Sequence, residues 1–297
     1  MGPADLAAVP RHTAPAPTGV SLWHDVDLRV KDWLDEETGL FRYVNEMPKG
    51  SLQKFEVQPH LPENAIEEDP KGSSRLAAFG RPVPFNYGCL PQTYRDPEHV
   101  DELYGAPGDD DPLDILDLSG EAVGVGEVVQ CRPLGAVCLI DEGRADWKIL
   151  AVNAERGPLA AARSVEDVER LAPGRIAECM EWMDDFKKSG GKGEATLHFK
   201  IHDASTAIKL IEQDHASWRT LLAEAAPTGT ARGHWVRQRS KSEDPAAAAH
   251  AAPMLAEVPR HTAPAPTGVS LWHDVDLRVK DWLDEETGLF RYVNEMP

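Results

Sequence analysis

The chain has few basic residues and no long apolar run. It carries 31 Lys and Arg against 50 Asp and Glu among its 297 residues, a formal net charge of -19. Because proteins bind nucleic acid through clustered Lys and Arg, this balance argues against a nucleic-acid partner. No apolar run approaches the roughly 20 residues that cross a bilayer, so we expect no membrane-spanning segment and no membrane partner.

Cysteine is also scarce. The four cysteines have no CxxC spacing and lie in apolar or mixed surroundings: Cys89, Cys131, Cys138 and Cys179. We predict reduced, packed thiols, which are typical of a reducing compartment. The first residues have neither the basic start nor the apolar core of a signal peptide. The sequence therefore predicts a cytoplasmic protein.

A long segment occurs twice. Residues 9 to 48 and 258 to 297 are the same forty residues, displaced by 258 − 9 = 249 positions, which is the length of a domain rather than of a solenoid unit. We divide the chain into a flexible N-terminal segment (1–17), a functional domain (18–236), a linker (237–257) and a truncated second copy (258–297). Three explanations of the repeat stay open: the start of a tandem copy, an element that exchanges with its twin, or an artefact of the gene model.

The functional domain begins with strands. Residues 39–44 and 52–57 alternate apolar and polar side chains, which places Lys54 and Glu56 on one face of the second strand. Residues 127–140 are predicted as a pair of strands around Pro133-Leu134-Gly135, and 147–152 as another strand. Several short strands at this spacing favour a small barrel.

Helices dominate the second half. Ser164 and Asp167 have capping-box spacing at the start of one helix, and the apolar face that follows Ile176 predicts a second. The two glycines at 190 and 191 should end that helix. A strand at 195–201 and a last helix at 204–225 complete the pattern. Residues 71–74, just before Arg75, are predicted to form a loop.

Two acidic runs suggest metal chemistry. Residues 108–114 read Gly-Asp-Asp-Asp-Pro-Leu-Asp, and 141–148 read Asp-Glu-Gly-Arg-Ala-Asp-Trp-Lys. Carboxylates this close repel one another, so a fold that gathers them needs Mg²⁺ or a similar hard cation. An EF-hand is excluded because Leu113 falls where a ligand should be and Asp114 where the loop needs glycine. Asp114 also opens an apolar run that predicts a buried strand, and a carboxylate at the start of such a strand requires a cation or strong hydrogen bonds.

These motifs resemble the soluble family I inorganic pyrophosphatases, most closely the eukaryotic type. Residues 109–114 match the family's D-x-D-P-x-D signature, and the likeness runs from about 20 to 222 through the segments 85–88, 91–94 and 215–218. The resemblance implies a mainly β protein with flanking helices, a five-stranded oligonucleotide-binding-like (OB-like) barrel with helices packed around it. It also implies Mg²⁺-dependent hydrolysis of pyrophosphate to two orthophosphates, and a homo-oligomer, commonly a dimer.

The resemblance implies roles residue by residue. The carboxylates that would hold metal ions are Asp109, Asp114, Asp146, Asp141 and Glu56. Asp111 resembles the base that takes a proton from the attacking water, with Tyr87 and Lys148 also catalytic. The phosphate-binding residues would be Lys54, Arg75, Tyr87, Lys148 and Lys187. Glu46 and Glu142 fall at supporting acidic positions.

Each role has a plain structural alternative. Lys54 and Glu56 could be an exposed strand pair, which contributes about 0.2 to 1 kcal/mol. Tyr87 could be a turn aromatic packed on the barrel rim. Lys187 could only complement the dipole at the end of its helix. Arg75 could be an ordinary loop residue.

Two positions depart from the family. The family usually has tyrosine at position 186 and at position 83, where this chain has Phe186 and Val83. A lost hydrogen bond to a charged group costs on the order of 1.5 to 3 kcal/mol. The alternative to an active enzyme is therefore a catalytically impaired, metal- and phosphate-binding regulatory or interaction module.

Overall fold

The computed structural model describes residues 9–16, 18–32, 37–189, 196–226 and 228–236, without the side chains of 196–199. The chain divides into two compact units, residues 1–238 and 239–297, and every described residue belongs to the first. The predicted linker, the second copy and the glycine stop at 190–191 lie outside the described residues.

Five strands form a closed ring. The hydrogen-bonded order is β2 (Glu37–Met47), β5 (Asn86–Cys89), β6 (Asp114–Asp117), β8 (Arg144–Asn153) and β7 (Val128–Asp141), and β7 pairs again with β2. The pairing of β6 with β8 is parallel and the others are antiparallel. β1 (Arg29–Lys31) and β9 (Thr196–Asp203) extend the sheet beside β2 and β7. The expected five-stranded, OB-like barrel is confirmed.

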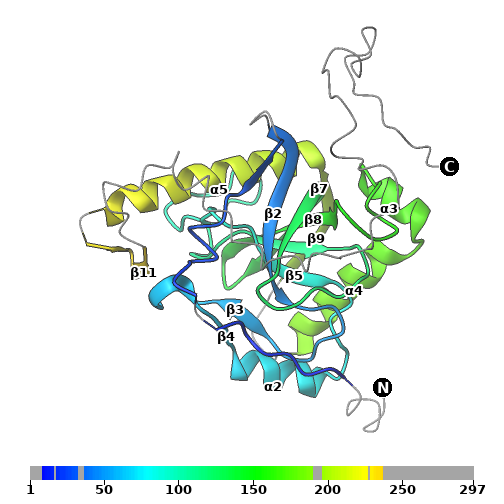
Figure 1. Ribbon diagram of the computed structural model, residues 1–297. Coiled ribbons are helices and arrows are strands. Elements are labelled where there is room, and N and C mark those ends of the chain that lie inside the picture. Colours follow the sequence, from blue (N-terminus) through cyan, green and yellow to red (C-terminus); the bar gives the residue numbers. More distant parts are fainter. Residues whose placement is uncertain (1–8, 17, 33–36, 190–195, 227, 237–297) are drawn as a thin grey trace, which may run out of the picture. The chain divides into compact units, whose positions relative to one another are not determined.

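Helices and short strands surround the ring (Figure 1). α5 (Ala204–Ala225) packs along β7 and β9, while α4 (Arg175–Ser189) contacts β9, α3 (Val165–Leu171) and α2 (Pro70–Phe79). α2 follows a small hairpin of β3 (Phe55–Val57) and β4 (Ile66–Glu68), which encloses the 3₁₀ turn η1 (Pro62–Asn64). After α5 the chain forms another small hairpin from β10 (Thr230–Ala231) and β11 (His234–Trp235).

Side-chain caps fix where the helices begin. The predicted cap at Ser164 is confirmed, since its hydroxyl accepts from the Asp167 backbone N–H. The prediction of a loop at residues 71–74 is wrong, because those residues lie inside α2. The Asp69 carboxylate accepts from the Lys71 N–H, and Pro70 at the first helical position already has the helical φ. Arg75 is therefore held on a helix.

The prediction of two strands around residues 133–135 is also wrong. β7 continues through this stretch with only a register shift between Pro133 and Gly135. The reversal comes later, between β7 and β8, where Glu142 and Gly143 have φ values of 51° and 79°. Positive φ at both central residues suits a two-residue hairpin turn.

β8 contributes to two hydrophobic cores because successive side chains point to opposite faces. On β8, Leu150 belongs to the core lined by α4, and its neighbour Ile149 to the core that α5 covers. All four cysteines are buried and free, which confirms the predicted packed thiols. Within the described part of the chain, none of the helices is long and apolar enough to span a bilayer.

Candidate active site

The first acidic run forms the loop between β5 and β6. Asp109 is half-buried, and its Oδ1 atom is enclosed without a hydrogen-bond partner among the described residues. Burial and the nearby charges of Asp146 and Asp114 raise the pKa of Asp109 well above its usual value. Asp111 is exposed to solvent. The surrounding protein nevertheless removes much of its water and, with Asp114 and Glu56, raises its pKa to about 7.

Strand register brings the two acidic runs together. Asp114 begins β6, as predicted, and pairs in parallel register with Lys148 of β8. Asp146 lies two residues earlier on the same face of β8. The Lys148 amine donates to both carboxylates, to Asp114 Oδ2 and, at 2.5 Å, to Asp146 Oδ1. Burial alone would lower the pKa of Lys148, but the two carboxylates raise it well above its usual value.

Tyr87 completes this cluster from β5. Its hydroxyl oxygen accepts from the Lys148 amine at 2.9 Å. Burial and the negative charge of Asp114 raise the pKa of Tyr87 well above its usual value, so the phenol keeps its proton. Tyr87 can therefore donate a hydrogen bond to an anion, as its predicted role requires.

A second cation–carboxylate pair comes from β3. Lys54 Nζ lies 2.5 Å from Glu56 Oε2 and 3.4 Å from Asp69 Oδ2. Both Lys54 and Glu56 exert a charge effect on Asp111, which places this face of β3 beside the acidic loop. Behind it, Glu46 is buried on β2 and accepts from the Val57 N–H at 2.7 Å.

A third pair comes from the end of α4. Lys187 Nζ lies 2.5 Å from Asp141 Oδ2, at the end of β7, and 4.0 Å from Asp146 Oδ2. The Lys187 amine thus reaches the second acidic run as well as lying at a helix C-terminus. Among the described pairings, each predicted phosphate-binding lysine contacts one or more predicted metal ligands.

Arg75 is held differently. Its guanidinium carbon lies 4.0 Å from the centroid of the Phe186 ring, and its Nε is buried without a hydrogen-bond partner among the described residues. Phe186 in turn stacks on Trp182, with ring centroids 5.1 Å apart. Phe186 therefore packs against the face of the Arg75 guanidinium. This contact uses none of the arginine's N–H groups as a hydrogen-bond donor.

The second departure from the family has a different setting. Val83 is 1% exposed and packs in the core with Leu76 and Phe85. Its side chain is part of the hydrophobic interior, so the valine contributes to packing at this position.

One supporting interaction could not be found from the sequence. Arg95 donates through Nη1 to both carboxylate oxygens of Asp214, at 3.2 Å each, and both side chains are buried. The Arg95 N–H also donates to the Asp111 carbonyl at 2.8 Å. α5 thus helps to hold the acidic loop. The partners are separated by 119 residues, and no local pattern joins them.

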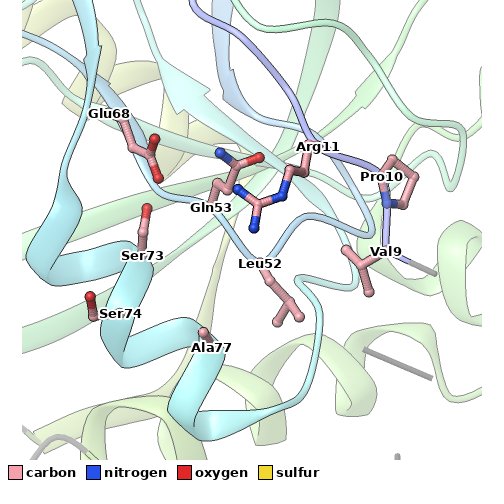
Figure 2. A pocket seen from close by; sticks show the side chains of 9 residues that line it. All are labelled: Val9, Pro10, Arg11, Leu52, Gln53, Glu68, Ser73, Ser74 and Ala77. Carbon is pink, nitrogen blue, oxygen red and sulfur yellow. The ribbon is translucent and has the colours of Figure 1, made fainter. Parts of the chain in front are cut away.

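A pocket of about 330 Å³ lies next to this site rather than in it (Figure 2). One side of the pocket is formed by residues 9–11, and the opposite side by Ser73 and other residues of α2. Leu52 and Gln53, just before β3, lie between the two sides. It contains none of the predicted site residues. Ser73 of the pocket wall contacts a predicted site residue, because its hydroxyl accepts from the Lys54 backbone N–H at 2.9 Å.

The donor set fits a hard divalent cation. All the predicted ligands are carboxylates, whose oxygens Mg²⁺ prefers, and the enclosed Asp109 Oδ1 has no hydrogen-bond partner among the described residues. No three acidic, histidine or cysteine side chains of the described residues already converge as a metal cage. Lys148 helps to explain why Asp114 and Asp146 do not converge on a cation position, because its amine lies between the two carboxylates and neutralises them.

Comparison with known proteins gives a consistent result. The family model for inorganic pyrophosphatase matches residues 43–219. Inorganic pyrophosphatase 1 of Caenorhabditis elegans is 32% identical over 86% of this chain and 60% of its own length. The inorganic pyrophosphatase of Bos taurus is 35% identical over 69% of this chain and 71% of its own length.

A solved structure agrees as well. An N-terminally truncated vacuolar soluble pyrophosphatase of Trypanosoma cruzi, in complex with PPi, superposes with a TM-score of 0.60 at 30% identity. The match covers 69% of this chain and 80% of that one. The family model covers more than half of the chain, and the barrel carries the acidic clusters that the family signature predicts. The chain belongs to the inorganic pyrophosphatase family.

Proposed function

We propose that this chain hydrolyses inorganic pyrophosphate to two orthophosphates with the help of several Mg²⁺ ions. The observation that carries the proposal is the position of Lys148, whose amine lies between Asp114 and Asp146 and also reaches Tyr87. Such alternation of cations and carboxylates suits a substrate that arrives as an anion together with divalent cations. The Trypanosoma cruzi relative, solved with PPi, supports the choice of substrate.

The carboxylates that would hold the ions are Asp109, Asp114, Asp146, Asp141 and Glu56. Bound Mg²⁺ would neutralise phosphate charge and lower the pKa of the attacking water toward neutrality. Once the carboxylates have other counter-charges, Lys54, Lys148 and Lys187 are free to exchange their present partners for phosphate oxygens. Arg75 needs no such exchange, because its buried Nε has no partner among the described residues.

Asp111 is the residue that would accept the proton. As water forms a bond to one phosphorus atom, a water proton passes to the Asp111 carboxylate and the bridging P–O bond breaks. The charge that develops on the leaving phosphate is stabilised by Lys148 and by the Tyr87 hydroxyl.

No observation favours the impaired alternative. Every acidic and basic residue of the predicted set is present, and the change at position 186 leaves Arg75 supported. Four free, buried cysteines suit the cytoplasm, which stays the compartment that we propose. A dimer is likewise proposed on the family resemblance alone.

Phosphate release from pyrophosphate tests the function directly. We expect release with millimolar Mg²⁺ and none with EDTA. Asp111→Asn should lower the rate by roughly 10²- to 10⁴-fold, the usual contribution of a general base. Folded protein that binds Mg²⁺ but releases no phosphate would contradict the proposal and support a binding module.

A further inference from the structure

Asp110, the residue between Asp109 and Asp111, has an unusual backbone conformation. Its φ is 74°, in the left-handed region that residues other than glycine rarely adopt. Aspartate tolerates this region better than most residues, but the conformation still has to be stabilised. Because Asp110 joins the two residues, its φ and ψ set how the Asp109 and Asp111 carboxylates are oriented relative to one another.

Two side chains from distant parts of the chain hold the Asp110 carboxylate. The Tyr94 hydroxyl donates to Asp110 Oδ1 at 2.5 Å, and His234 Nε2 lies 3.1 Å from the same oxygen. A carboxylate oxygen can only accept, so His234 Nε2 carries the proton in this contact. The Asp110 N–H donates to the Arg95 carbonyl at 3.0 Å, which fixes the backbone beside the side chain.

Both donors are themselves firmly packed. Tyr94 is fully buried and His234 is 7% exposed. Their rings meet edge to face with centroids 5.5 Å apart, and His234 meets Trp23 in the same way at 5.6 Å. The Trp235 N–H donates to the Pro59 carbonyl at 2.7 Å and anchors β11. The donors therefore form a rigid support for Asp110.

His234 is not part of the region that the family model matches, which ends at residue 219. The contact is a feature of the small hairpin of β10 and β11. Neither His234 nor Tyr94 has a role in the chemistry proposed above, and Asp110 is not among the predicted metal ligands. Asp110, where the two donors meet, nevertheless lies between the predicted ligand Asp109 and the predicted base Asp111.

We propose that Tyr94 and His234 are positioning residues, which fix Asp110 and so hold the neighbouring ligand Asp109 in the orientation that binds divalent cations. This inference rests on the proposed metal-dependent function. Hydrogen bonds behind metal ligands typically change metal affinity by about 10- to 100-fold when they are removed. The Asp110 contacts should act through metal affinity and leave the chemical step largely intact.

The test measures Mn²⁺ binding to the full chain without substrate, by electron paramagnetic resonance. Tyr94→Phe keeps the ring and removes the hydroxyl, and His234→Ala removes the imidazole. We expect each variant to bind Mn²⁺ about 10- to 100-fold more weakly. The Mg²⁺ concentration for half-maximal phosphate release should rise accordingly, while kcat at saturating Mg²⁺ stays near that of the unchanged chain.

Two further variants separate positioning from loosening of the hairpin. His234→Gln retains an amide donor and should recover most of the Mn²⁺ affinity. Thr228→Val removes the hydroxyl that donates to the Thr230 carbonyl of the same hairpin, a bond in which neither Tyr94 nor His234 takes part, and should leave the affinity unchanged. Unchanged Mn²⁺ binding in both Tyr94→Phe and His234→Ala overturns the inference, as does equal weakening in Thr228→Val.

Failure of the proposed function gives a different result. If the unchanged chain neither binds Mn²⁺ nor releases phosphate, the metal-dependent activity itself is wrong. If it does both and the Tyr94 and His234 variants match it in Mn²⁺ binding, the activity stands and only the positioning role fails.

Discussion

The guanidinium of Arg75 lies over the ring of Phe186, 4.0 Å from its centroid. The arginine comes from α2 and the phenylalanine from the last turn of α4, next to Lys187. One cation of the predicted phosphate-binding set is thus supported by the neighbour of another. The contact explains how phenylalanine can occupy a position where the family usually has tyrosine.

Phe186→Leu should weaken substrate binding by removing this support while keeping an apolar side chain. Cation–π contacts contribute about 0.5 to 2 kcal/mol, so KM for pyrophosphate should rise about 2- to 30-fold. Phe186→Tyr keeps the ring and should not raise KM. Steady-state kinetics at saturating Mg²⁺ measure both variants, and an unchanged KM in Phe186→Leu would show that Arg75 needs no aromatic support.

Restoring the other family tyrosine should not help. Val83 is 1% exposed in the core beside Leu76 and Phe85, and Val83→Tyr adds a large ring with a hydroxyl there. Overpacking of this kind costs typically about 1 to 3 kcal/mol. We expect a fall in Tm of roughly 2 to 12 °C in a thermal melt. A variant with unchanged Tm and improved KM would show that position 83 faces the substrate after all.

The buried pair Arg95–Asp214 should be important for stability. The two side chains are 3% and 2% exposed. Asp214→Ala leaves the Arg95 charge buried without its partner, a change that costs about 3 to 5 kcal/mol. Chemical denaturation measures this free energy of unfolding. Replacing both residues by apolar ones removes the unpaired charge, so this double variant should recover part of the lost free energy of unfolding. If Asp214→Ala is as stable as the double variant, the unpaired Arg95 charge is not the cause of the destabilisation.

How far the sequence predicted these features depends on how local their causes are. Ser164 and Asp114 were placed correctly, because a cap and a buried strand are signalled by residues a few positions away. The start of α2 was missed although Asp69 and Pro70 signal it locally. The bulge in β7 was mistaken for a turn because Pro133 and Gly135 are typical of both.

The site's supporting contacts required the structure. The predicted ligands Asp109 and Asp114 could be proposed from the sequence because the signature that contains them, residues 109–114, is contiguous. The donors to Asp110 come from Tyr94 and His234, which are 16 and 124 residues away. The register of β6 against β8, which brings Lys148 to Asp114, is likewise a long-range pairing. No periodicity in one segment can specify such contacts.

The cap of α5 gives a prediction about pH. Asp203 accepts from the Thr206 N–H and hydroxyl and from the Ser205 hydroxyl, and these bonds lower its pKa to about 2. A lowered pKa means that the stabilisation is present above about pH 4 and is lost as the pH falls through about 2. The Tm difference between the unchanged chain and Asp203→Ala should therefore narrow from pH 5 downward. Asp203→Asn keeps an uncharged acceptor, and its difference from Asp203→Ala should vary little with pH.

The repeat at 258–297 offers the domain a second copy of the segment that forms β1 and β2. The chain leaves the described domain next to the first copy, since the Trp235 carbonyl lies 3.0 Å from His24 Nε2. The segment predicted as a linker, residues 237–257, has a contour length of roughly 70 Å at about 3.3 Å per residue. Residues 49–236 together with the repeat at 258–297 contain the same sequence elements as residues 9–236, in a different order along the chain. The second copy could thus replace the first without any change of sequence.

Substitutions in the full chain test this exchange. Phe41 is 4% exposed in the core, and position 41 + 249 = 290 is Phe290. A buried Phe→Ala change costs about 3 to 5 kcal/mol, yet Phe41→Ala alone should leave Tm and phosphate release nearly unchanged if residues 258–297 take over. Phe290→Ala alone should leave Tm and phosphate release unchanged, and the double variant should lose the full amount, about 3 to 5 kcal/mol of stability.

The concentration dependence of Tm in the Phe41→Ala variant separates two kinds of exchange. If the second copy replaces the first within one chain, Tm does not depend on protein concentration. If Tm rises with concentration and the molecular mass increases, the copies are exchanged between chains. A single Phe41→Ala variant as unstable as the double would eliminate exchange, because the second copy would then be unable to occupy the place of the first.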